Sequence, residues 1–174
     1  MEDPIKFPLW RQFGASIDML INVIAKSPDD FFIKHKRFYY IAYHSTLFLD
    51  YYSTFPPKDF SAMLPFTQME MSQRPQEAID DLIPDRIYSK KELLRYLLEI
   101  RAKCKNLVEG LTDDKYRQRF SEGNGENDMD YPILEIFLYN MRHTQHHVAQ
   151  LNLLVRQELN VHMEWSFREG DIQL

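Results

Sequence analysis

Three of the six histidines in this 174-residue chain crowd into five positions, within RHTQHHVAQLNLLVRQ at 142–157. His143 and His147 stand four residues apart, so their side chains share one face of a helix. Two imidazoles at this spacing can bind one metal ion. On a helical wheel both lie on or beside an apolar stripe, whereas His146 falls outside it. The pattern predicts two inward-facing histidines and one on a flank.

Two ligands are too few for a stable metal site. His44, in YHSTLFLDYY at 43–52, is the one other histidine on an expected core stripe. We therefore predict a site of His44, His143 and His147. Neutral imidazoles suit zinc, nickel, copper or iron(II), and three protein ligands leave a position open for water or substrate. The residue pattern is equally compatible with core histidines that hydrogen bonds satisfy.

Neighbouring polar residues are candidates for supporting roles. Asn140 and Gln150 lie near the histidine stripe and can orient imidazoles, because metal-bound histidines usually donate their other N–H to an oxygen; ordinary interhelical hydrogen bonds are the alternative. His146 is either a proton shuttle at the mouth of the site or a surface residue. Asp50 is expected to act at a helix end or to hydrogen-bond to a neighbouring helix, and Cys104 is expected to be an inert buried thiol. No general base can be assigned.

Four long helices are expected to position these residues. Apolar residues at three- and four-residue steps predict them at about 9–26, 34–54, 89–110 and 132–158. Ser89 and Glu92 form a capping box for the third, and Asp130 is the expected cap of the fourth. His35 is expected to be solvated. A short helix is predicted at 113–120, followed by an exposed acidic loop at 121–130.

The connection between the second and third helices is unusually long. It has about 33 residues and holds five of the nine prolines, so it is either functional or a crossover. DDLIP at 80–84 is interpreted as a turn of helix, and no alternating strand pattern is visible. The predicted fold is an all-α four-helix bundle with one long crossover, forming a single domain over residues 1–174.

Composition limits the classes of partner. The net charge of −5 argues against nucleic acid, which needs a basic face. No run of about 18 apolar residues exists, so no membrane span is expected. The N-terminal sequence MEDPIKFPLW lacks the features of a secretory signal, and one cysteine excludes an internal disulfide. We expect a cytoplasmic protein.

The two histidine-bearing stretches resemble the metal-binding helices of the DinB/YfiT-like superfamily. In that family a histidine is followed four residues later by a second, then by a Gln-Leu or Gln-Ile pair and an arginine. His143, His147, Gln150-Leu151 and Arg156 match this pattern, and His44 matches the first ligand on the second helix. These specific motifs cover about 25 residues; the loop at 55–88 and the tail at 159–174 match nothing in the family.

The resemblance implies a bundle with an up-down-down-up course and a divalent metal on the three histidines, commonly nickel or zinc, with iron as an alternative. It also implies a homodimer. Activities in the family include thiol-dependent transferases and isomerases that use low-molecular-weight thiols such as bacillithiol or mycothiol. We therefore expect a metal-dependent hydrolase or thiol transferase acting on a small molecule. A non-catalytic metal- or ligand-binding bundle and a purely structural bundle are the alternatives.

Overall fold

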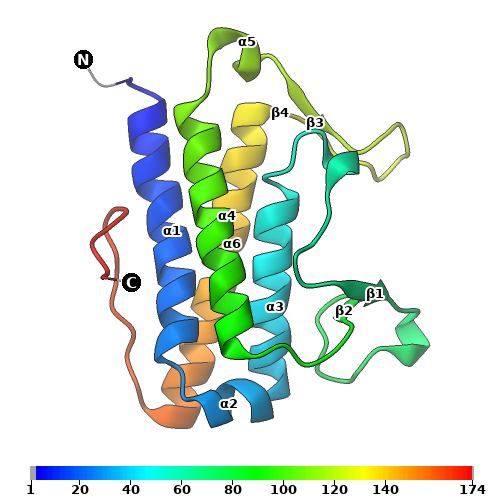
Figure 1. Cartoon of the computed structure of the whole chain (residues 1–174), viewed down its shortest axis with the longest axis vertical. Helices are drawn as coiled ribbons and strands as arrows, with labels where there is room; N and C mark the ends of the chain where they lie inside the picture. The colour runs from blue at the N-terminus through cyan, green and yellow to red at the C-terminus, as the bar shows by residue number, and fades with distance from the viewer. Residues whose placement is uncertain (1–2, 174) are drawn as a thin grey trace.

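Four long helices lie side by side in the computed structural model, which describes residues 3–173. They are α1 (Lys6–Lys26), α3 (Lys36–Tyr51), α4 (Lys90–Glu109) and α6 (Ile133–Leu159), and Figure 1 shows them packed lengthwise. Helix α1 packs on α4 and α6, and α3 packs on the same two helices. The expectation of a mainly helical protein is confirmed.

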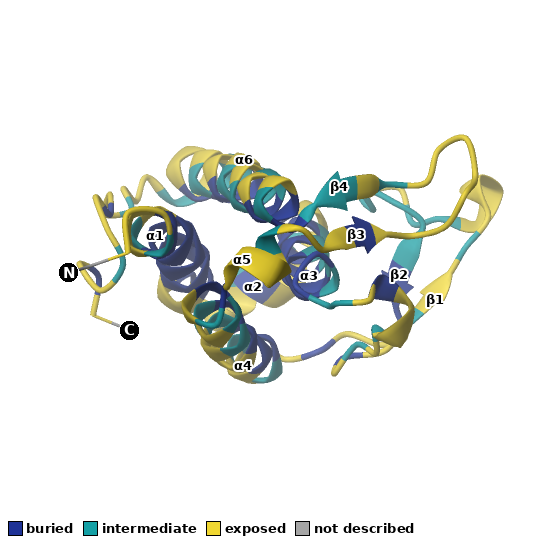
Figure 2. Ribbon diagram, turned by 90° about the horizontal axis from the view of Figure 1, so that it is seen from above, coloured by how far each residue is buried: buried dark blue, intermediate teal, exposed yellow. Residues whose placement is uncertain are grey.

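Helix α1 is buried on nearly every side, as its dark-blue ribbon shows in Figure 2. Four apolar residues of this helix at three- and four-residue steps, Phe13, Ile17, Leu20 and Ile24, are fully buried in the core. Part of its remaining surface is covered by the C-terminal tail, residues 160–173, which runs back alongside it (Figure 1). The tail therefore lies along the bundle, and polar residues of α1 such as Asp18 are buried too.

The second predicted helix is in fact two. Helix α2 (Asp29–Lys34) ends at His35, and α3 starts immediately after it. The side chain of His35 accepts a hydrogen bond from the backbone N–H of Phe38 at 3.1 Å. The expectation that His35 is simply solvated was therefore wrong, because an imidazole nitrogen can satisfy a free N–H at the start of a helix.

Helix α4 begins and ends as the sequence predicts. Ser89 accepts from the backbone of Glu92, while the Glu92 carboxylate accepts from the backbone N–H of Ser89, which completes the capping box. Gly110 is the C-terminal cap. This reciprocal arrangement satisfies two backbone donors that the helix itself leaves free.

Two small antiparallel sheets were not expected. Strand β1 (Phe66–Gln68) pairs with β2 (Leu82–Pro84), and β3 (Arg119–Ser121) pairs with β4 (Asp130–Pro132). The interpretation of DDLIP as helical was therefore wrong, since three of its residues form β2. Strands of three residues are too short to produce a recognisable alternating pattern.

The region before α6 also differs from expectation. The short helix α5 (Asp113–Tyr116) is followed by β3 rather than continuing to 120. Asp130 lies in β4, where its carboxylate accepts from Arg119 at 2.6 Å, and Pro132 occupies the cap position of α6. The loop between β3 and β4 is exposed, as predicted. The long connection before α4 holds two short 3-10 helices, Pro57–Asp59 and Met71–Gln73.

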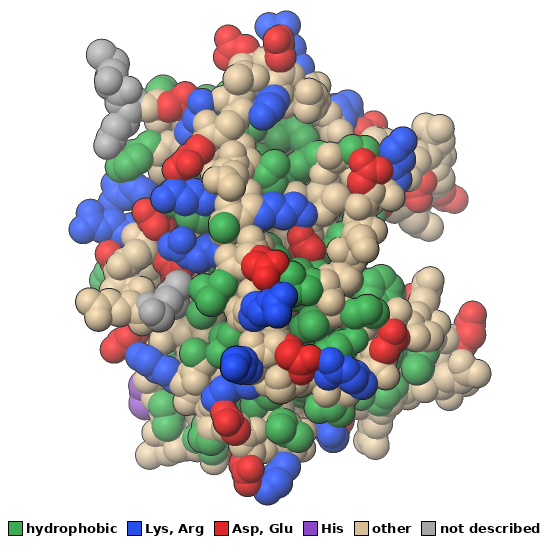
Figure 3. Space-filling model, in the orientation of Figure 1, with side chains coloured by type: hydrophobic (Ala, Val, Ile, Leu, Met, Phe, Trp, Pro, Cys, Tyr) green, Lys and Arg blue, Asp and Glu red, His purple; other side chains and the backbone are tan. Residues whose placement is uncertain are grey.

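Charged side chains of both signs are interspersed over the face shown in Figure 3. Among the described residues, no helix has both the length and the apolar character that a bilayer crossing requires.

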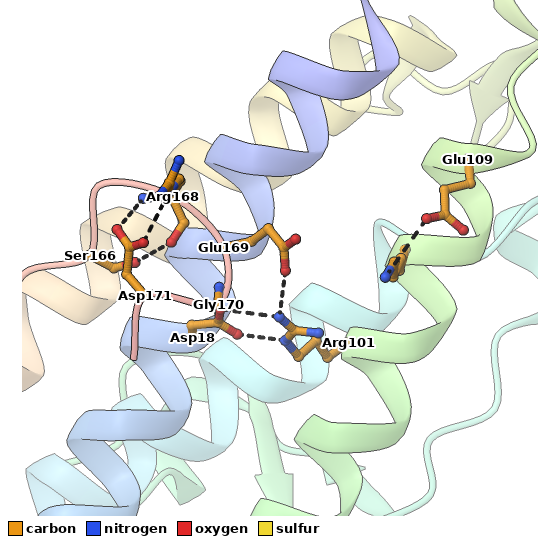
Figure 4. Close-up of polar contacts among 9 residues, drawn as sticks. Asp18, Arg101, Glu109, Ser166, Arg168, Glu169, Gly170 and Asp171 are labelled. Atoms are coloured by element: carbon orange, nitrogen blue, oxygen red, sulfur yellow. Dashed lines mark hydrogen bonds and ion pairs between the residues drawn. The ribbon is translucent and has the colours of Figure 1, made fainter. Parts of the chain in front are cut away.

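A buried ion pair joins α1, α4 and the tail (Figure 4). Asp18 is fully buried and accepts from Arg101 Nε at 2.5 Å and from the Gly170 backbone N–H at 2.8 Å. Arg101 also donates to Glu169 at 3.1 Å. Elsewhere, Asp50 bonds across to α4, accepting from Tyr96 and Lys103 as its expected interhelical role requires.

We predict that Asp18→Ala lowers the free energy of unfolding by about 3 kcal/mol, because it leaves a mostly buried guanidinium without its main partner. Urea denaturation followed by circular dichroism measures the change. The control is Asp30→Ala, which removes the exposed Asp30–Lys34 pair and should change little. Equal effects of the two substitutions would contradict a structural role for the buried pair.

Candidate metal centre

Helices α3 and α6 bring three histidines together. The Nε2 atom of His143 lies 3.2 Å from Nε2 of His44 and 3.1 Å from Nε2 of His147. Each of the three residues offers one potential ligand atom, and these three atoms all lie within 4.8 Å of one another. His143 and His147 come from successive turns of α6, and His44 faces them from the middle of α3.

Burial keeps two of these rings uncharged. His147 is buried and His143 is half-buried. Removal from water, together with the smaller effect of the neighbouring imidazoles, lowers the pKa of His143 to about 3 and that of His147 to about 4. Each ring is therefore neutral near pH 7 and carries one nitrogen lone pair that can bind a cation.

A carboxylate lies behind His44. Its Nδ1 atom contacts Asp80, whose other carboxylate oxygen accepts from the backbone N–H of Leu82 at 2.9 Å. A carboxylate only accepts, so the Nδ1–H of His44 is the donor, and in the neutral form of the ring Nε2 carries a lone pair that faces the other histidines. Sequence reasoning did not find Asp80. Its only signal was an acidic pair, 80–81, within the long connection.

Gln150 plays the matching role behind His147. Its side-chain oxygen lies 2.8 Å from Nδ1 of His147, one turn along α6. The Nδ1–H therefore donates to Gln150, and Nε2 of His147 also carries a lone pair. On His143, Nδ1 is buried and has no hydrogen-bond partner within residues 3–173. Outer partners of this kind are typical of metal-binding histidines, whose tautomer and orientation they fix.

The donor set fits a divalent metal ion. Nitrogens bound at about 2.0–2.1 Å to one ion stand roughly 3 Å apart, which agrees with the Nε2 separations of 3.1 and 3.2 Å. At least two of the three nitrogens present lone pairs toward the same point, and His143 can donate a proton to only one of them. A cation at that point would satisfy all three. Three imidazoles suit zinc, nickel, copper or iron(II).

Aromatic rings surround the histidines and limit the access of water. The Phe48 ring centroid lies 4.5 Å from that of His44. Tyr52 packs edge-on against His143 at 5.6 Å, and Tyr139 stacks on the same ring at 6.2 Å. Burial raises the pKa of Tyr52, so its hydroxyl stays protonated. Such an environment strengthens electrostatic interactions at the cluster.

Two other predicted residues lie elsewhere. Among the described residues, Asn140 forms no hydrogen bond to an imidazole; its side-chain amide donates to the Leu49 carbonyl and to Ser53 Oγ, both at 3.0 Å. It therefore ties α6 to α3. His146 is exposed, and although its ring lies 5.1 Å from that of His147, it is not part of the three-nitrogen group. Its place is on the flank, as the helical wheel predicts.

Cys104 is buried, and burial raises the pKa of its thiol to about 12. The thiol is therefore protonated and unreactive near neutral pH, in agreement with the expectation of an inert side chain. Its Sγ lies 3.1 Å from Ser53 Oγ, so it extends the hydrogen-bonded chain that begins at Asn140.

The histidine cluster has an edge near the surface. His143 lines a depression of about 300 Å³ together with Tyr139, Arg142 and His146. All four residues belong to one face of α6. A small molecule in this depression would contact His143 directly.

Comparison with protein families identifies the group to which these features belong. Residues 38–151 match the model of the DinB superfamily, and this span contains all three histidines together with Asp80 and Gln150. No curated protein and no solved structure matches the chain. Because the family model covers more than half of the sequence, the chain belongs to the DinB superfamily.

Proposed function

We propose that this chain is a metal-dependent enzyme that binds one divalent cation on His44, His143 and His147 and transforms a small molecule. The observation that carries this proposal is the convergence of three Nε2 atoms with separations of 3.1 and 3.2 Å, two of them backed by an oxygen acceptor on the other ring nitrogen. If these residues were only core histidines satisfied by hydrogen bonds, three Nε2 atoms would not need to converge in this way.

Nickel or zinc is the proposed metal, with iron as an alternative. A bound divalent cation supplies Lewis-acid chemistry, because it lowers the pKa of a water or thiol that joins the three histidines. Water as the nucleophile gives a hydrolase, and a low-molecular-weight thiol gives an S-transferase. The protein's own contribution is positional: Asp80 and Gln150 hold two rings, and the surrounding aromatic side chains limit the access of bulk water.

The wider proposal includes the molecular context. The four long helices follow the DinB-like up-down-down-up course, which the directions of α1, α3, α4 and α6 in Figure 1 support. The chain forms one domain over residues 1–174, acts in the cytoplasm as a homodimer, and takes a small molecule rather than nucleic acid or a membrane as its partner. The net charge of −5 supports the exclusion of nucleic acid.

A non-catalytic bundle that binds a metal or small ligand is the second candidate. One observation favours it. Within residues 3–173, Asp80 is the carboxylate that contacts the histidine cluster, and it is already hydrogen-bonded to His44. Glu135, the acidic residue on α6 nearest before His143, is exposed. A general base would therefore have to come from the substrate, a cosubstrate or the solvent.

We predict that wild-type protein purified without a histidine tag binds one nickel or zinc ion per chain. His44→Ala, His143→Ala and His147→Ala should each weaken binding more than about 100-fold, since loss of even an outer partner typically costs 10–100-fold. Isothermal titration with each metal measures affinity, and circular dichroism checks folding. The matched control is His146→Ala, which should bind normally. Equal loss in the control would contradict the assigned ligand set.

We predict a graded effect at the residue behind His44. Asp80→Asn removes the charge that holds the Nδ1–H of His44 and should lower metal affinity by about 10–100-fold. The control is Asp81→Asn, since Asp81 bonds instead to Gln68 at 2.7 Å. Competition with a chromogenic chelator gives the affinities. Identical affinities for the Asp80 and Asp81 variants would refute the orienting role.

Turnover distinguishes the two candidate functions. Metal-loaded protein is tested against a panel of esters and amides for hydrolysis, and against electrophiles with bacillithiol, mycothiol and glutathione for S-transfer. The enzyme proposal predicts activity on at least one panel that disappears in His147→Ala. Metal binding without turnover on either panel would favour the non-catalytic bundle.

A further inference from the structure

A second concave surface lies outside the histidine cluster. It is a groove of about 680 Å³ between α1 and α6, closed on one side by the C-terminal tail. Small-molecule sites typically have volumes of about 300–1,000 Å³, so the groove is large enough for a ligand. Nothing in the proposed metal chemistry uses it.

The walls of this groove are largely apolar. Ala15 and Met19 contribute from α1, Leu138 and Met141 from α6, and Trp165 from the tail. Leu138 is 46% exposed and Trp165 is 62% exposed. Large apolar side chains that are exposed singly are ordinary, but their convergence on one concave surface marks a binding site.

Contacts of the neighbouring residues, rather than burial of Trp165 itself, anchor the backbone around Trp165. Before it, Glu164 pairs with Lys26 at 3.0 Å. After it, the Phe167 carbonyl accepts from Gln12 at 3.1 Å, and the Glu169 backbone N–H donates to the Arg11 carbonyl at 2.9 Å. Figure 4 shows the following residues fastened to the buried pair of α1 and α4. The backbone on both sides of Trp165 is therefore fixed, so little ordering of the main chain is needed when a ligand packs against the indole.

The polar part of the groove has one sign of charge. No aspartate or glutamate lines it, although the chain as a whole carries a net charge of −5. Arg142 lines it and has no carboxylate partner within residues 3–173; its guanidinium lies over the Tyr139 ring, 5.5 Å from the centroid. His146, exposed beside it, adds a ring N–H that can donate.

We propose that this groove binds an amphipathic monoanion, an alkyl or aryl carboxylate. Its apolar part lies between α1 and α6 against Trp165, and its carboxylate pairs with Arg142, whose planar guanidinium suits a carboxylate. Arg142 and His146 also line the smaller depression that reaches His143. The charged end of the ligand therefore lies on the side nearest the histidine cluster. The site itself does not depend on a bound metal.

Decanoate is the probe, with octanoate and decylammonium as comparisons. They are titrated into metal-free protein, because a carboxylate would also bind a metal ion. Calorimetry should show one decanoate per chain, about tenfold weaker binding of octanoate because two fewer methylenes are buried, and no measurable binding of decylammonium. Tryptophan emission should shift to shorter wavelength as decanoate covers Trp165, whereas Trp10 is already buried.

Matched variants locate the site. Arg142→Gln should weaken decanoate about fivefold, the effect of one partly exposed ion pair, and Trp165→Ala about tenfold. Arg117→Gln and Phe167→Ala, which alter an exposed arginine and an exposed tail aromatic outside the groove, should bind normally, as should His44→Ala. Absence of decanoate binding, binding that ignores both groove variants, or equal binding of decylammonium would overturn the proposal.

Discussion

Three imidazole nitrogens that face one another cannot all satisfy one another when the rings are in their neutral form. Each neutral ring has one donor and one acceptor. Asp80 and Gln150 accept the Nδ1 protons of His44 and His147. The Nε2 atoms of these two rings therefore both face His143 with a lone pair. A buried polar group without a partner costs free energy. A divalent cation would remove that cost at all three rings, so the cluster has the donor set that a metal site requires.

The rest of the fold maintains this arrangement. Asn140, one turn before His143, bonds to both Leu49 and Ser53, and so fixes the position of α6 along α3. Ser53 in turn contacts Cys104 of α4. On the opposite side of the bundle, the buried pair of Asp18 and Arg101 joins α1, α4 and the tail. These contacts prevent the helices from sliding, which would separate imidazoles that belong to different elements.

The local parts of this arrangement could be predicted from the sequence. The four-residue spacing of His143 and His147 defines a helix face, and the capping box at Ser89 marks a helix start. His44 was found because it lies on an apolar stripe. Asp80 was missed because it lies in an irregular connection, 36 residues from the histidine it contacts. For Asn140, an orienting role and an interhelical hydrogen bond both stayed open, because a helical wheel identifies a face but not the atoms opposite it.

X-ray absorption spectroscopy at the metal edge of protein loaded with one equivalent of zinc or nickel tests the central claim most directly. The three-histidine site predicts three imidazole nitrogens at about 2.0–2.1 Å, with the characteristic outer-ring scattering of histidine. That signal should weaken in His147→Ala and persist in His146→Ala. A metal surrounded by oxygen atoms alone, or the same spectrum from both variants, would contradict the account.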